Sequence, residues 1–172
     1  MANSVPPIEH CCDKEIYAFF GLAAYLAQVV EHGALSLAVI LRISVPKRAT
    51  RRVFDELYNS LSKRTLGRLL AACKKDLVLA EEDQKLLSKA LDLRNRLTHH
   101  FFREHAINFA FAAGRETMMR ELQEAISVLS DADDLLTRVY IPLGEKFGLT
   151  QNFIDQQLAY MQRADQAHGP RA

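Results

Sequence analysis

Three side chains that can hold a phosphate and move a proton lie close together in the chain, at Arg94, Asn95 and His99. A permanent guanidinium charge can stabilise a phosphate, and an imidazole can transfer a proton near neutral pH, so this chemistry requires no metal. On a helix, Asn95 and His99 are one turn apart and share a side. Arg94 and His99 are about 140° apart on an ideal helix. One ligand can meet both only if the arginine reaches across, the helix bends or a second chain contributes.

The helix expected around these residues, about 81–105, has acids in its first turn and a histidine near its last, as the helix dipole prefers. Arg94 lies in its apolar stripe, where a leucine would be expected. The other residues on this face are Leu87, Ala90, Leu91, Leu97, Thr98 and Phe101. Burying a guanidinium without an anionic or carbonyl partner would cost several kcal/mol. Either a carboxylate such as Glu31 pairs with Arg94, or this face lines a site.

The order of these residues resembles the signature of HEPN domains, which are small all-helical modules of prokaryotes and eukaryotes. That signature is an arginine, a polar residue, and a histidine a few residues further on, here Arg94, Asn95 and His99. The surrounding segment 97–102 (LTHHFF) and the upstream segment 65–70 (TLGRLL) also look like bacterial members of the group. The chain is therefore expected to be a single HEPN-like domain.

The resemblance implies a metal-independent endoribonuclease that works as a symmetric homodimer and needs no cofactor. In that role His99 would transfer protons, Arg94 would stabilise the charged phosphate, and Asn95 would position the imidazole or a phosphate oxygen. RNA carries its own nucleophile in the 2′-OH, so the products would end in a 2′,3′-cyclic phosphate and a 5′-OH. A toxin-like role in a stress or phage-defence pair, with a cognate antitoxin or regulator as partner, is the biological expectation.

Each residue also has a purely structural interpretation. Arg94 could be a core ion-pair member, Asn95 could brace a kink, and His99 could be an ordinary helix histidine. His100 leaves open which imidazole acts, although the spacing favours His99. Arg96 is expected to face solvent, with an auxiliary contact to phosphate as the alternative. The alternative function is a non-catalytic HEPN-like interaction, regulatory or nucleotide-binding module.

Composition indicates the fold class. The chain has 172 residues, of which 49% are hydrophobic, which suits one core rather than two. Seven glycines, five prolines and no tryptophan favour helices over a sandwich or barrel. The prediction is an all-α protein, an antiparallel up-and-down bundle of four to five main helices, with flexible tails at about 1–8 and 164–172.

Hydrophobic periodicity and helix breakers predict the individual elements. A first long helix is expected at 13–43 and a second helix at 51–60. A third, at 62–74, is either separate or a continuation past a kink at Gly67. The motif helix follows, then an apolar bridge that ends at Gly114. A long helix is expected at 115–140, with Pro142 and Gly144 loosening the next turn, and a last helix at about 150–163.

Charge is unevenly distributed, although the formal net charge is only +1. The segment 42–75 holds ten cations and only two acids, Asp55 and Glu56. Such a patch attracts phosphates, but on helices it is also typical of a solvated face. The cations proposed for an RNA-binding patch are Arg48, Arg51, Arg52, Lys63 and Arg64.

The remaining patterns favour a cytoplasmic protein without metal. Three cysteines with no paired C-x-x-C array suit a reducing compartment. The apolar stretch 19–41 is interrupted by Gln28, Glu31 and His32, so we expect no membrane span. The histidines near the motif diverge on a helix and lack partners at zinc spacing, so we expect no metal site and no cofactor.

Overall fold

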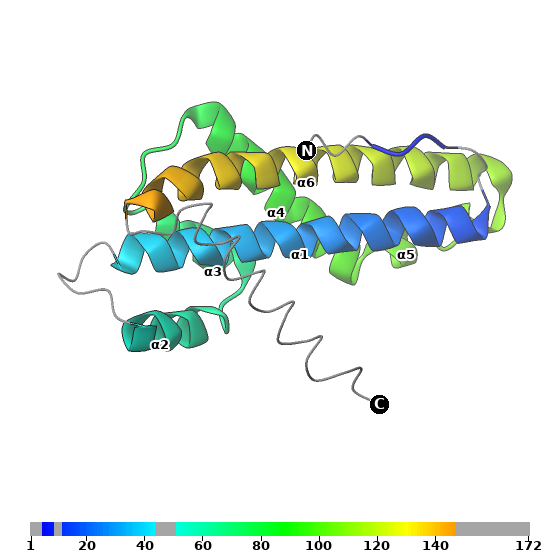
Figure 1. The fold of residues 1–172 in the computed structure, drawn as a ribbon. Helices are drawn as coiled ribbons and strands as arrows, with labels where there is room; N and C mark the ends of the chain where they lie inside the picture. The colour runs from blue at the N-terminus through cyan, green and yellow to red at the C-terminus, as the bar shows by residue number, and fades with distance from the viewer. Residues whose placement is uncertain (1–4, 9–11, 44–50, 147–172) are drawn as a thin grey trace, which may run out of the picture.

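The computed structural model describes residues 5–8, 12–43 and 51–146 of the chain, and these form an all-helical bundle (Figure 1). The described helices are α1 (Asp13–Ile43), α2 (Arg51–Leu61), α3 (Leu66–Cys73), α4 (Glu81–His99), α5 (Phe101–Glu104), the 3₁₀ helix η1 (Asn108–Ala110) and α6 (Ala112–Glu145). No strand occurs in these ranges, so the all-α prediction is confirmed. The helix expected at 150–163 and the tails 1–4 and 164–172 lie outside them.

The three long helices run up, down and up. Figure 1 shows α1 and α6 side by side with their N-terminal ends together. Asp13 Oδ1 lies 3.8 Å from Arg115 Nε near those ends, and Gly33 packs against Leu136 near the other ends. Helix α4 runs opposite to both, because its end lies beside the middle of α1 and the first half of α6. Consecutive long helices are therefore antiparallel.

Helix α1 is central because it is apolar on more than one side. Its buried residues face α6, α3, α2 and α4, and they join one hydrophobic core to which α2, α3, α4, α5 and α6 all contribute. This helix is also the one described helix that is long and apolar enough to cross a membrane by length and composition, and 56% of its most apolar window is buried inside the protein. Packing within the bundle accounts for that apolar character.

The predicted bounds of α1 are confirmed, whereas those of α6 are too short. Gly114, expected to break the helix, lies inside its first turn, where an added Cβ would lie 2.2 Å from the carbonyl oxygen of Asn108. The glycine is therefore required by close packing rather than by a turn. Pro142 also lies inside α6. It is exposed and near the helix end, so the carbonyl left without its N–H partner can face water.

Two further expectations are corrected. The motif helix ends at His99 instead of 105, and a separate short helix, α5, follows. The N-terminal tail is not loose over residues 5–8, because Val5 and Ile8 pack against the core. The Pro6 carbonyl also accepts a hydrogen bond of 3.1 Å from Gln123 Nε2. Gly67 lies within α3 and produces no kink between two joined helices, since α2 and α3 are separate.

Candidate functional site

Arg94 emerges from α4 toward α1, and its side chain is only 23% exposed. Its Nη2 lies 3.3 Å from Glu31 Oε2 on α1, which confirms that this carboxylate is its partner. Its Nη1 donates to Asn95 Oδ1 at 3.2 Å. A guanidinium has five N–H donors. Within the described ranges two of them are used, so Arg94 keeps donors that a phosphate could accept.

Asn95 and His99 are both exposed on the last turns of α4. The helix stays regular through His99 and changes direction only after it, at His100. A bend therefore does not carry His99 toward Arg94. What brings the groups closer is the arginine side chain, which leans toward Asn95, the residue one turn before His99.

The two adjacent histidines have different surroundings. His100 Nδ1 accepts a hydrogen bond of 2.7 Å from Arg103 Nη2, since an arginine can only donate. His99 makes no hydrogen bond or ion pair within the described ranges, and its ring centroid lies 6.0 Å from that of His100. Of the two imidazoles, His99 is the one with both nitrogens available to a ligand.

A hollow of about 220 Å³ lies between α1 and α4 beside these residues. Helix α1 contributes Phe20, Ala24, Gln28 and Glu31, and α4 contributes Arg94 and Thr98. The Thr98 hydroxyl is occupied, because it donates to the Arg94 carbonyl at 2.9 Å. The hollow therefore presents one guanidinium, one carboxylate and one amide on an otherwise apolar lining.

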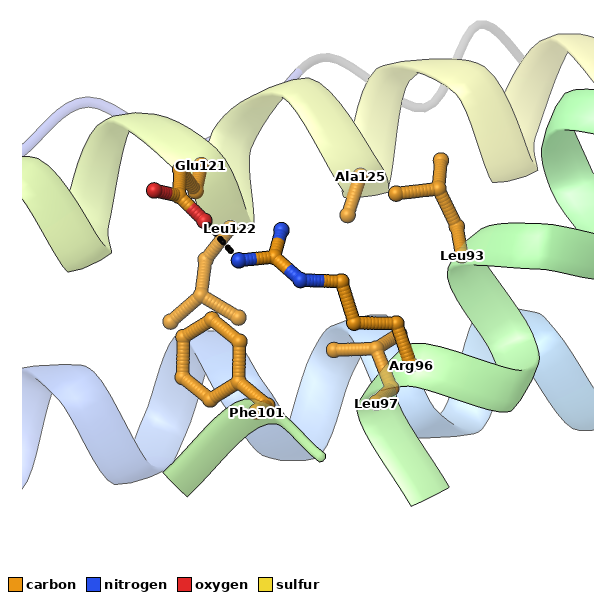
Figure 2. Close-up of a pocket in the computed structure, with 7 residues that line it drawn as sticks. All are labelled: Leu93, Arg96, Leu97, Phe101, Glu121, Leu122 and Ala125. Carbon is orange, nitrogen blue, oxygen red and sulfur yellow. Dashed lines mark ion pairs between the residues drawn. The ribbon is translucent and has the colours of Figure 1, made fainter. Parts of the chain in front are cut away.

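Arg96 points to the other side of α4, toward Glu121 on α6 (Figure 2). Its Nε lies 2.7 Å from Glu104 on α5, and its Nη2 lies 2.7 Å from Glu121 on α6. The hydrogen bond to Glu104, followed by that to Glu121, raises the pKa of Arg96, although partial burial opposes the rise. The side chain of Arg96 is 37% exposed, but it is tied to two helices rather than free in solvent. It is thus ill placed to contact a phosphate.

His105 completes this network and was not foreseen from the sequence. Its side chain is 5% exposed, and its Nε2 lies 3.1 Å from Glu121 Oε2. Asn108 Nδ2 lies 3.0 Å from Nδ1, so Nδ1 accepts and Nε2 carries the hydrogen that goes to Glu121. His105 and Glu121 are sixteen positions apart, and no local pattern links them. Together these contacts fix the bend after His99.

The predicted basic patch is only partly assembled. Arg52 pairs with Glu56 on its own helix at 2.8 Å, and Lys63 is exposed. Arg64 is partly buried in the turn between α2 and α3 and lines a second hollow. Arg48 and the side chain of Arg51 lie outside the described residues.

Comparisons of the chain with protein-family models, curated proteins and solved structures found no match. The resemblance to HEPN domains therefore depends on the motif residues and their helical setting. Asn95 and His99 are exposed near the end of α4, and Arg94, which is mostly buried beside α1, contacts Asn95. Such a set can bind a phosphate and exchange a proton with it.

Proposed function

We propose that the chain is a metal-independent endoribonuclease of HEPN type that acts as a homodimer. The observation that carries the proposal is the state of the motif side chains. His99 is exposed and without a hydrogen bond in the described ranges, and Asn95 lies one turn away in contact with Arg94. The buried His105 has partners for both ring nitrogens, whereas the ring nitrogens of the exposed His99 are open to a ligand.

The proposed reaction needs only these groups and the RNA itself. The 2′-oxygen attacks the adjacent phosphorus, and an imidazole accepts the 2′ proton. The bond from phosphorus to the 5′-oxygen breaks, and that oxygen receives a proton. Arg94 stabilises the charge on the phosphate during the transfer. The products are a 2′,3′-cyclic phosphate and a 5′-OH, with no water or metal consumed.

A second copy of the chain supplies what one copy lacks. Helix α4 is regular through His99, so Arg94 and His99 of one chain project from different sides of it. A partner chain would set its own His99 opposite Arg94, and two imidazoles would then serve as base and acid. The exposed aromatic side chains of Tyr17 and Phe102, whose ring centroids lie 5.9 Å apart, provide apolar surface near this end of α4 for a contact between subunits.

The test is cleavage of several RNA substrates in excess EDTA by the wild type and three variants. His99→Ala and Arg94→Ala should each lower the rate by about 100-fold or more. His100→Ala is the matched control and should retain most of the rate. End-group analysis should find cyclic phosphate and 5′-OH. Cleavage that is unchanged by His99→Ala would refute the proposal, and a monomer mass at all concentrations in sedimentation would refute the shared site.

The alternative is a non-catalytic HEPN-like interaction, regulatory or nucleotide-binding module. One observation favours it, because Arg94 already pairs with Glu31 inside its own chain and could simply brace α1 against α4. This module would bind RNA or a nucleotide without side-chain-dependent cleavage. The toxin or defence role, the cognate antitoxin or regulator, the cytoplasmic location and the absence of a membrane contact stay predictions.

A further inference from the structure

A second hollow adjoins the one beside Arg94. It also measures about 220 Å³ and lies where α1 faces α2 and the turn before α3. Its polar lining comes from Gln28, Glu31, His32, Tyr58, Ser62 and Arg64. Gln28 and Glu31 line both hollows, so the two meet across one turn of α1. The two hollows therefore adjoin each other on α1, one toward α4 and the other toward the turn after α2, and together they are called the groove.

Each half of this groove combines an arginine with an aromatic ring. Arg94 and Phe20 line the first half, and Arg64 and Tyr58 line the second. All four are partly buried. This repeated pairing is the chemistry of a single-stranded nucleic-acid channel, where cations follow the phosphates and rings stack on the bases.

The charge of the groove is also suited to a polyanion. The side chain of Arg64 makes no ion pair or hydrogen bond within the described ranges, and Arg94 has donors to spare. Glu31 is the single carboxylate among the described residues that line either half. Two guanidinium groups against one carboxylate leave a net positive groove, while Glu31 holds Arg94 in place.

We propose that this groove binds single-stranded RNA, with the cleaved phosphate at Arg94 and a flanking nucleotide held by Arg64 and Tyr58. The inference rests on the proposed ribonuclease function and adds to it a subsite for a flanking nucleotide. A duplex keeps its bases stacked inside, so it cannot offer them to Phe20 and Tyr58. A single strand can offer one base to each half.

The test measures binding separately from cleavage. A fluorescein-labelled single-stranded RNA is titrated with the full chain carrying His99→Ala, and anisotropy gives Kd at one fixed salt concentration. Adding Arg64→Ala should raise Kd by at least about fivefold, as should Tyr58→Leu, which keeps apolar bulk but loses the ring. Tyr58→Phe should bind as the parent does. Arg68→Ala is the matched control, because Arg68 is also an arginine, four residues further on, but is exposed and outside the groove.

Three results would overturn the groove: an unchanged Kd for Arg64→Ala, an equal loss for Arg68→Ala, or equal affinity for a duplex. The second result would mean that the RNA is bound by the general positive charge of the surface and not by the groove. In the cleaving enzyme, Arg64→Ala should raise KM with little change in kcat, because the contact is the same in the ground and transition states. If RNA binding depends on Arg64 and Tyr58 but the wild-type chain never cleaves RNA, the proposed nuclease activity is overturned and the proposed groove is supported. If cleavage depends on His99 but is unchanged by Arg64→Ala, the nuclease activity is supported and the groove is overturned.

Discussion

Replacing Glu121 by leucine should destabilise the fold, because Glu121 connects α4, α6 and the segment after α5. The substitution keeps side-chain bulk and removes the carboxylate that accepts from His105 and pairs with Arg96. His105 is 4% exposed, so its Nε2 hydrogen would lose its acceptor in a place that water barely reaches. Leaving a buried donor unsatisfied costs about 1–3 kcal/mol.

The ion pair adds less to this cost. The side chains of Arg96 and Glu121 are 37% and 31% exposed, so solvent screens their attraction, and Arg96 keeps Glu104 as a partner. About 0.5 kcal/mol is appropriate for such a pair. The sum is about 1.5–3.5 kcal/mol, which for a chain of this size lowers Tm by about 3–14 °C.

Urea unfolding followed by circular dichroism measures the free energy, with thermal unfolding as a second readout. The matched control is Glu124→Leu, one turn further along α6, whose carboxylate pairs with the exposed Lys89 at 2.6 Å. It should unfold close to wild type, since that pair is solvated. Equal unfolding free energies for Glu121→Leu and Glu124→Leu would show that the Arg96 and His105 network does not hold the bend. Faster amide exchange over 100–105 in Glu121→Leu alone would locate the effect there.

Three shorter predictions concern other parts of the fold. Gly114→Ala should lower the free energy of unfolding by about 1–3 kcal/mol, because the new Cβ would lie 2.2–2.7 Å from backbone atoms of Asn108. Gly21→Ala should raise it by about 0.5–1 kcal/mol, because nothing lies within 4 Å of the new Cβ. Urea unfolding that gave the opposite order would contradict the packing at Gly114. Burial, and then the neighbouring Asp134, raises the pKa of Asp133, so the native state resists its ionisation and stability falls as pH rises above the ordinary carboxyl range. Asp133→Asn should therefore raise Tm at neutral pH, with the gain vanishing below about pH 4, and a gain that persists in acid would argue against this cause. Burial raises the pKa of the Cys73 thiol to about 11, so in a variant whose other two cysteines are serine a thiol reagent at pH 8 should label nothing until urea is added.

Residues near one another in the chain were well predicted. The bounds of α1 follow from its apolar periodicity, and the start of α4 at Glu81 follows from a run of acids in the first turn. An ion pair of Arg94 with Glu31 or another carboxylate was one of the interpretations that the sequence left open, and the structure shows the pair with Glu31. These inferences need only helix geometry and the cost of burying charge.

Close contacts between distant segments could not be inferred in the same way. Gly114 was predicted to break the helix, yet it lies within α6. The backbone of Asn108 occupies the space that a side chain at this position would need. Arg96 was expected to face solvent, yet it forms ion pairs with two carboxylates, one from α5 and one from α6. The residues within a few positions of Gly114 or Arg96 contain no pattern that predicts these contacts.

The sequence by itself determined that this protein is helical, where α1 begins and ends, and which residues form a polar motif at the end of an amphipathic helix. Only the tertiary structure decided that α4 stays straight through His99, that Arg94 leans toward Asn95, and that two hollows adjoin each other on α1. The physical reason is the distance along the chain over which each interaction acts. Periodicity and capping act over a few residues, whereas a groove exists only once helices distant in sequence pack together.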